Sequence, residues 1–297
     1  MHIIDISQAQ DTDAWLQQRI GKITGTKAGA LSMEHYAQKD VAKIEAMAEK
    51  AKTDAKRIEY LHKAEQARID NQRLKVPAEF WGFLAEMWAE PAGNEPPMAR
   101  GHRLENENIR QACEKLSIDT GTVEFDTGLW VRDDDERIAI SPDAHEKTEQ
   151  PTFAFEAKSL GTRNHLMAVV PYTTWYDLHS GDKPVDAATD AVHDMLLALF
   201  PDVLRDDLTA FDFVPDVYKA QVLQYFAVND NLETVYFTML DDRVYCQLSH
   251  VVMTVRREDV QDKVEEQLAS ERRTLAYVDM LSNEFSAGAF AGEQGEW

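Results

Sequence analysis

The sequence predicts an α/β protein built on a mixed sheet of about five strands that is flanked by helices. Short segments in which apolar and polar residues alternate indicate strands, and longer amphipathic segments indicate helices. The predicted strands span residues 123–131, 137–143, 152–158, 235–239 and 250–255. The predicted helices are one long or two moderate helices within residues 38–74, then 217–228 and 259–281, and a further helix begins near Gly101.

The size of the chain sets its domain organisation. With 297 residues, of which 44% are hydrophobic, it can bury a substantial core as one elaborated domain or two small ones. We interpret residues 1–285 as a single domain and the small, acidic segment 286–297 as a flexible tail. Residues 38–75 are predicted to be a helical elaboration with a thin buried stripe. Residues 171–216 are interpreted as an acidic insertion, because they contain ten Asp against one Lys and one Arg.

The composition also predicts where the protein works. No apolar run approaches the roughly 20 residues needed to span a bilayer, and the first residues lack the pattern of a signal peptide. Cys113 and Cys246 lie far apart without a C-x-x-C partner, which argues against a zinc ribbon or a cysteine-ligated iron–sulfur cluster. We therefore expect a protein of the reducing cytoplasm.

The most informative motif is an Asp followed, on the next strand, by a Glu and a Lys two residues apart. Glu156 and Lys158 share one face of the predicted strand 152–158, whereas Phe155 points to the other face. The polar segment 145–151 has turn composition, so a hairpin is expected to bring Asp143 toward Glu156. Two carboxylates can hold a divalent cation, and a Lys can support a phosphate or an attacking water. The alternative is a surface hairpin with a solvated ion pair.

A third carboxylate is a candidate ligand. Glu105 lies in the helix that begins near Gly101, beside the stripe formed by Ile109, Ala112 and Leu116. A carboxylate that points inward is costly unless it is paired or bound to a metal. The alternative is a Glu in the first turn of the helix that interacts with the helix dipole and reaches water.

Two further segments carry candidate binding residues. Arg19, Thr24 and Thr26 lie around a turn between two glycines, a composition that suits a phosphate. The alternative there is an ordinary helix C-cap with flanking cations. In the amphipathic helix 217–228, Gln221 shares a face with Tyr218 and Tyr225.

The order of these pieces resembles the lambda exonuclease or YqaJ-like viral recombinase nucleases, a branch of the PD-(D/E)xK superfamily, over about residues 13–281. The motifs that carry the resemblance are W-x-x-x-R-x-G-x-I-T-x-[ST] at 15–26, G-x-x-x-E at 101–105, S-P-D at 141–143, E-x-K at 156–158, A-Q-V-x-x-Y at 220–225 and Asp-Asp-Arg at 241–243. The resemblance implies a restriction-endonuclease-like core.

The resemblance also implies roles for individual residues. Asp143 and Glu156 would ligate Mg²⁺ or Mn²⁺ with the Ala157 carbonyl and Glu105, and Lys158 would orient or activate the attacking water. Gln221 would support the metal site or the scissile phosphate. In the opening motif, Arg19 and Thr26, with Thr24 beside them, would bind the 5′ phosphate of a DNA end.

The function implied is that of a phage-type recombination exonuclease in a bacterial host cell. It would degrade the 5′-ended strand of duplex DNA and leave a 3′ overhang for a single-strand annealing protein, and such enzymes often form trimers. The net charge of −22 is unusual for a protein that binds DNA, although a local basic channel can coexist with an acidic exterior. Two alternatives remain: an endonuclease or nickase with the same site, and a catalytically silent DNA mimic or binding protein.

Overall fold

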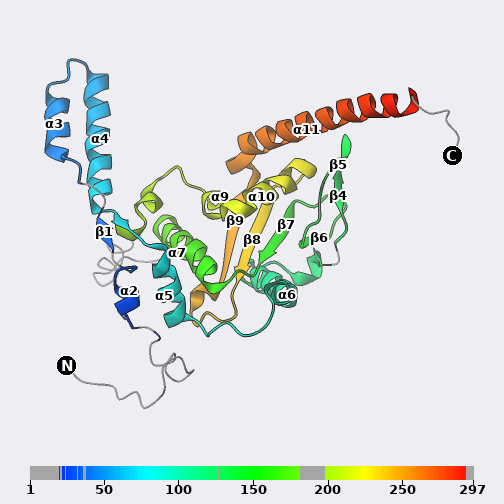
Figure 1. Cartoon of the computed structure of the whole chain (residues 1–297), viewed down its shortest axis with the longest axis horizontal. Coiled ribbons are helices and arrows are strands. Elements are labelled where there is room, and N and C mark those ends of the chain that lie inside the picture. Colours follow the sequence, from blue (N-terminus) through cyan, green and yellow to red (C-terminus); the bar gives the residue numbers. More distant parts are fainter. Residues whose placement is uncertain are drawn as a thin grey trace, which may run out of the picture. The chain divides into compact units, whose positions relative to one another are not determined.

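The computed structural model describes residues 20, 22–23, 25–31, 33–35, 38–125, 127–180 and 198–291 (Figure 1). The chain divides into two compact units made of interleaved segments. Unit 1 comprises Met1–Pro97, Leu160–Leu208 and Asp241–Ser249, and unit 2 comprises Met98–Ser159, Thr209–Leu240 and His250–Trp297. None of the described helices is both long enough and apolar enough to cross a membrane.

Unit 2 contains a five-stranded mixed sheet, as the sequence predicts. Its strands, in the order β3-β6-β7-β8-β9, are β3 (Val123–Glu124), β6 (Ala144–Glu146), β7 (Phe153–Lys158), β8 (Thr234–Leu240) and β9 (His250–Arg256). Only the β7–β8 pair is parallel. A short 3₁₀ helix, η1 (Thr120–Thr122), precedes β3.

Helices cover this sheet, and alternation along β7 determines which side chain meets which helix. Phe155 belongs to a buried cluster with Ile109 and Ala112 of α6 (Pro97–Leu116). Glu156 faces the other way, where Tyr225 of α10 (Asp216–Val228) contacts it. Helix α9 (Ala210–Phe213) packs on β9, and α11 (Arg257–Ala291) packs on α10. The predicted division of β7 into two faces is therefore confirmed.

Two strand predictions are wrong in their bounds and pairing. The predicted strand 137–143 is β5 (Asp135–Ile140), which pairs with β4 (Trp130–Arg132) in a separate two-stranded sheet. The partner of β7 is instead the short strand β6, which starts after Pro142. Proline has no N–H to donate and interrupts a ladder, so the chain leaves one sheet before Pro142 and enters the other after it. The predicted strand 123–131 is likewise divided between β3 and β4.

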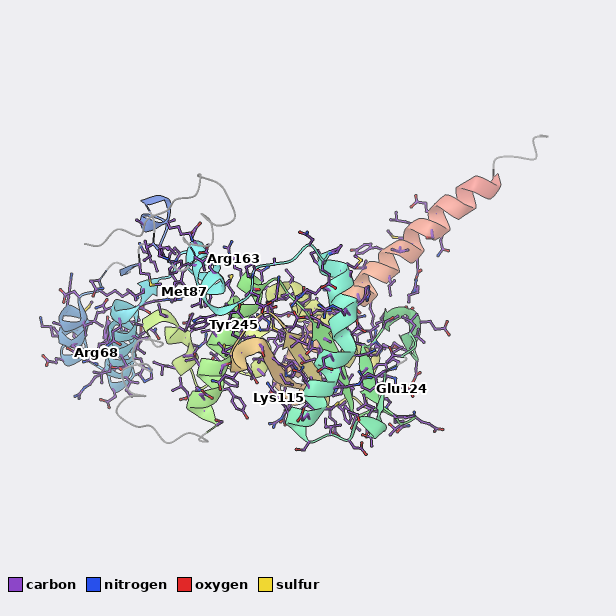
Figure 2. The ribbon with its side chains drawn as sticks, turned by 90° about the horizontal axis from the view of Figure 1, so that it is seen from below. Arg68, Met87, Lys115, Glu124, Arg163 and Tyr245 are labelled. Carbon is purple, nitrogen blue, oxygen red and sulfur yellow. The ribbon has the colours of Figure 1, made fainter. Side chains whose placement is uncertain are left out.

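Unit 1 is mainly helical. It contains α2 (Gly25–Ala28), α3 (Val41–Glu49), α4 (Asp54–Gln72), α5 (Ala78–Trp88), α7 (Thr162–His179) and the 3₁₀ helices η2 (Pro201–Leu204) and η3 (Gln247–Ser249), with a two-stranded sheet of β1 (Glu34–His35) and β2 (Leu74–Lys75). The predicted elaboration at 38–75 is the α3–α4 pair. Its buried side chains are small (Ala48, Ala64 and Ala67). Arg68 of α4, which is labelled in Figure 2, pairs with Glu45 of α3.

The acidic segment 171–216 does not form one element. Its first residues continue α7, which includes Pro171, and residues 181–197 lie outside the described part of the chain. Its last residues form η2, α9 and the start of α10. At the C-terminal end, α11 extends to Ala291, ten residues beyond the predicted end of that helix and into the predicted tail.

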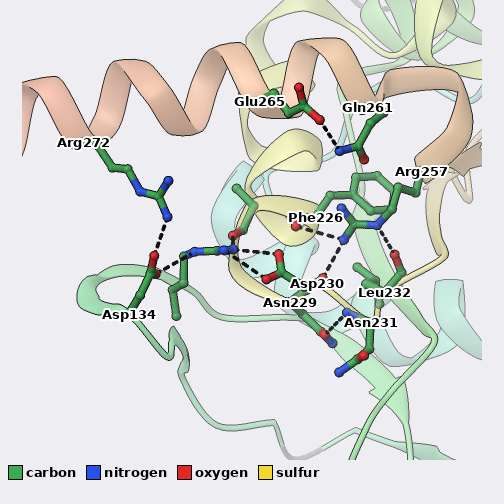
Figure 3. A network of polar contacts seen from close by, with 12 residues as sticks. Asp134, Phe226, Asn229, Asp230, Asn231, Leu232, Arg257, Gln261, Glu265 and Arg272 are labelled. Atoms are coloured by element: carbon green, nitrogen blue, oxygen red, sulfur yellow. Dashed lines mark hydrogen bonds and ion pairs between the residues drawn. The ribbon is translucent and has the colours of Figure 1, made fainter.

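Within unit 2, two arginines, Arg257 of α11 and Arg132 of β4, bind residues at the end of α10; Figure 3 labels Arg257 and the acceptor Asp230. Arg257 donates to the carbonyl oxygens of Leu232 at 2.7 Å, Phe226 at 3.0 Å and Asn229 at 2.6 Å. Arg132 bonds both carboxylate oxygens of Asp230, at 2.8 and 3.0 Å. Because the last carbonyls of a helix have no partner inside it, Arg257 supplies a donor to the Phe226 carbonyl at the end of α10 and a second donor to the Asn229 carbonyl, which also accepts from the Leu232 N–H.

Candidate active site

Glu156 is the buried centre of the candidate site. Its side chain is fully excluded from solvent in the middle of the sheet. The Tyr225 hydroxyl donates to Oε2 of Glu156 at 2.7 Å and lies 3.1 Å from the Phe155 carbonyl oxygen. The other carboxylate oxygen pairs with the ammonium group of Lys158, which lies two residues along the same strand face. A charged group at this depth is stable only with such partners.

Asp143 lies beside Glu156 because of the β6–β7 register. Ala144 pairs with Phe155, so the residue before β6 is level with the end of β7 that carries Ala157. The Ala157 N–H donates to Oδ2 of Asp143 at 2.7 Å. The structure thus places Asp143, Glu156, Ala157 and Lys158 together, on the strand pair that the sequence motif indicates.

The electrostatics of the site show a deficit of positive charge. Burial, with a contribution from the nearby Asp143, raises the pKa of Glu156 from its ordinary value to about 7, although Lys158 and Tyr225 oppose the shift. Burial also raises the pKa of Asp143, against the Ala157 N–H and Lys158. Burial alone would lower the pKa of Lys158, but Glu156 and then Asp143 raise it. Lys158 is therefore a cation, and the two carboxylates share it.

Glu105 lies at the margin of this group. Its side chain is about one-third exposed on α6, and Nδ1 of His102 lies 3.9 Å from its Oε2. Burial, and next the charge of Asp143, raise its pKa. Within the part of the chain that the structure describes, no three His, Cys, Asp or Glu side chains are close enough together to hold a metal ion. Glu105 is thus within electrostatic range of Asp143 without completing a three-carboxylate cluster.

The donors at the site nevertheless suit a hard divalent cation. Asp143, Glu156 and the Ala157 carbonyl would supply oxygen ligands, which Mg²⁺ and Mn²⁺ prefer over nitrogen and sulfur. Mg²⁺ in phosphate-processing sites is commonly held by one or two carboxylates together with the substrate phosphate. Asp143 and the fully buried Glu156, with Lys158 paired to Glu156, provide such a set.

Helix α10 contributes Tyr225 and Tyr218 rather than Gln221 to the observed contacts. The Lys158 ammonium lies 5.2 Å from the centre of the Tyr218 ring, and Tyr225 bonds Glu156. Gln221 is half-buried one turn from each tyrosine, and no hydrogen bond among the described residues joins it to Asp143 or Glu156. The helical spacing identified the correct face, and Tyr225 was the residue on it whose role was missed.

Asn108 of α6 is a second residue that the sequence did not reveal. It is fully buried, and its amide donates to the carbonyl oxygens of Lys158 at 3.3 Å and Thr238 at 3.2 Å. The Thr238 hydroxyl donates back to the Asn108 side-chain oxygen at 2.7 Å. Asn108 lies three residues after Glu105 and next to the buried Ile109, so a polar residue within the apolar stripe was the available signal.

The predicted 5′-phosphate residues fall largely outside the described residues. Arg19 and Thr24 are not among them, and Thr26 lies in α2 without a described side chain. In the same segment, the Lys27 ammonium donates to Glu86 of α5 at 2.6 Å.

Comparisons with known proteins found no matching family model and no matching curated protein. Among solved structures, the chain is similar to the crystal structure of an alkaline exonuclease (LHK-Exo) from Laribacter hongkongensis, with 15% sequence identity and a TM-score of 0.39. It is also similar to LHK-Exo in complex with dAMP, with 15% identity and a TM-score of 0.37. Each alignment covers 93% of this chain and 99% of the other.

Proposed function

We propose that this protein is a metal-dependent DNA nuclease whose active site consists of Asp143, Glu156 and Lys158. The observation that carries the proposal is the pair of carboxylates at one end of β7, of which Glu156 is fully buried, with the single ammonium group of Lys158 paired to it. A structural ion pair would need one acid and one base. A second acid beside the pair adds repulsion unless a further cation is bound.

In this proposal the residues have distinct chemical tasks. Asp143, Glu156 and the Ala157 carbonyl would hold Mg²⁺ or Mn²⁺, which lowers the pKa of water and polarises phosphoryl oxygens. Tyr225 fixes the orientation of the Glu156 carboxylate. Lys158 keeps its proton, so it acts as a donor toward the scissile phosphate or the attacking water. Glu105 would join the ligands, and Gln221 would contact the phosphate from α10.

The specific activity that we propose is digestion of the 5′-ended strand from the ends of duplex DNA, which leaves a 3′ overhang for a single-strand annealing protein. The resemblance of the opening motif supports an end-dependent enzyme, with Arg19, Thr24 and Thr26 on the 5′ phosphate. We further propose that it works as a homo-oligomer, such as a trimer, in the cytoplasm of a bacterial host.

A digestion experiment tests both levels of the proposal. The substrates are a linear duplex labelled at its 5′ ends and a covalently closed circular duplex, each with Mg²⁺, Mn²⁺ or EDTA. Asp143→Asn removes a proposed ligand, and the exposed Glu149→Gln is the matched control on the β6–β7 loop. We expect metal-dependent release of nucleotides from the linear substrate only, lost in Asp143→Asn and retained in Glu149→Gln.

Other outcomes lead to specific revisions. Cleavage of the circle would favour an endonuclease with the same residues. Equal activity in both variants would show that the site lies elsewhere. No metal-dependent cleavage of either substrate would favour the nuclease-derived binding protein, to which the net charge of −22 is suited.

A further inference from the structure

Unit 1 contains two pockets that adjoin at Tyr245. The first has a volume of about 770 Å³ and is lined by α5, the first turn of α7 and residues that include Arg243 and Tyr245. The second, of about 520 Å³, is lined by Met87, Trp88, Tyr245 and residues 246–248. Figure 2 shows Arg163, Met87 and Tyr245 in the same region. Neither pocket contains a residue of the candidate active site.

The aromatic residues between the pockets are held on a fixed backbone. Ala89 and Val244 form a β-bridge, and hydrogen bonds on either side of it join Tyr245 N to the Trp88 carbonyl and Glu90 N to the Arg243 carbonyl, each at 3.0 Å. The side chains on this backbone nevertheless remain accessible. Tyr245 is 66% exposed, Met87 51% and Trp88 37%. Large apolar side chains that lie together and exposed, as these three do around one pocket, commonly mark a binding surface.

Of the cations near these rings, one arginine has no carboxylate partner among the described residues. Arg243 bonds both oxygens of Asp241, at 2.9 and 3.1 Å, and Lys27 pairs with Glu86. Arg163, in the first turn of α7, is exposed, and no carboxylate among the described residues pairs with it. Among the described residues that line the pockets, Glu90 is the one acid with no cation paired to it. The described residues that line the pockets include two arginines, Arg163 and Arg243, and two acids, Glu86 and Glu90, so their formal charges balance in a chain with a net charge of −22.

We propose that the two pockets form a groove for single-stranded DNA, in which Tyr245 and Trp88 stack on bases and Arg163 binds a phosphate. Exposed aromatic rings beside a cation are the combination by which proteins hold single strands without reading their sequence. Bases must be unpaired to stack on side chains, which excludes intact duplex as the ligand. The inference rests on the proposed nuclease function and extends it, because it assigns a holding site for the separated strand.

Binding is measured in EDTA, so that cleavage does not contribute. The probe is a fluorescently labelled oligothymidylate of about 15 nucleotides, and an oligomer of the same length with abasic deoxyriboses supplies the same phosphates without bases. Tyr245→Leu keeps an apolar side chain but removes the ring, and Tyr245→Trp restores a ring. Tyr277→Leu on α11 is the matched control, because Tyr277 is 65% exposed.

We expect Tyr245→Leu to weaken oligothymidylate binding about tenfold, Tyr245→Trp to retain it, and Tyr277→Leu to leave it unchanged. Wild-type protein should prefer oligothymidylate over the abasic oligomer, and Tyr245→Leu should lose that preference. Arg163→Gln should weaken binding of both oligomers and reduce the slope of log K against log salt by about 0.7, whereas the exposed Arg273→Gln should not.

Equal affinities for the two oligomers, or equal effects of Tyr245→Leu and Tyr277→Leu, would contradict the proposal that the groove binds single-stranded DNA. The exposed aromatic surface would then be interpreted as a site for a protein partner. The digestion experiment separates the two proposals. If the protein digests DNA but its binding does not depend on the Tyr245 ring, the proposed groove is wrong and the proposed nuclease function stands. If binding depends on the ring but the protein digests no DNA, the groove stands and the proposed nuclease function is wrong.

Discussion

At the scale of single residues, the dominant fact is that Glu156 is more costly to ionise in the folded protein than in the unfolded chain. Burial and Asp143 raise its pKa to about 7, whereas the same group titrates near 4.5 when exposed. Between these values the folded protein keeps a proton that the unfolded chain has lost. The contribution of Glu156 to the unfolding free energy is therefore fully present below this pH window and is lost as the pH rises through it.

We predict that metal-free wild-type protein loses about 3 kcal/mol of unfolding free energy between pH 4.5 and 7 from this group, since each pKa unit corresponds to about 1.4 kcal/mol. Glu156→Gln should flatten that part of the profile, because the amide does not titrate. Urea unfolding in EDTA at several pH values measures this dependence of the unfolding free energy on pH. Glu149→Gln, which is exposed, should keep the wild-type profile.

A second residue-scale prediction concerns Asn108. Asn108→Ala should lower the unfolding free energy by about 2 kcal/mol or more, because the buried carbonyl oxygens of Lys158 and Thr238 lose their amide donor. Asn106→Ala, on the exposed face of the same helix, should change stability by about 0.5 kcal/mol or less. Similar losses in the two variants, measured by thermal unfolding, would contradict this account.

At the scale of elements, the end of α10 depends on a side chain from α11. Arg257→Ala removes donors from the carbonyl oxygens of Phe226, Asn229 and Leu232 and should destabilise the protein by about 3 kcal/mol. The neighbouring Arg256 is 64% exposed and makes one long ion pair, so Arg256→Ala serves as the control and should have little effect. Hydrogen exchange at the last turn of α10 should accelerate in Arg257→Ala alone.

The elements also show what the sequence could and could not predict. Alternation along β7 correctly predicted which of its side chains share a face, because successive side chains of a strand point to opposite sides of the sheet. Strand β6 was missed because three residues are too few to show a period, and a longer apolar run on the other side of Pro142 took its place. On α10, spacing identified the face but not which residue on it reaches Glu156, since reach depends on side-chain length and depth.

Partners that are far apart in the sequence and not joined by a hairpin could not be predicted from local patterns. Asn108 meets the Thr238 carbonyl across 130 positions of sequence, and no local pattern records such a pair. The division into two units made of interleaved segments is similarly invisible in composition, because its boundaries are set by contacts between distant segments.

At the scale of the whole molecule, a bound cation should stabilise the fold. A ligand present at 100 times its Kd and bound only by the folded state adds about 2.7 kcal/mol. We predict that Mg²⁺ or Mn²⁺ raises the Tm of the wild type, and does so more at pH 8 than at pH 5, because protons compete for Asp143 and Glu156 at the lower pH. Calorimetry without DNA measures this directly.

Asp143→Asn should lose the metal-dependent increase in Tm, while Glu149→Gln should keep it. An identical increase in both variants would mean that the cations act on the general acidity of the chain, with its net charge of −22, rather than at the site.

The distance along the chain between Glu156 and Tyr225 has a consequence for synthesis. The two residues are 69 positions apart, and β8, the parallel neighbour of β7, begins only at Thr234. At about 5–20 residues per second, a ribosome needs roughly 3–14 seconds to make the intervening chain. Until then, the Glu156 carboxylate has water in place of its hydroxyl partner. A nascent or truncated chain that ends between Lys158 and β8 thus carries the acidic residues of the site without the complete site.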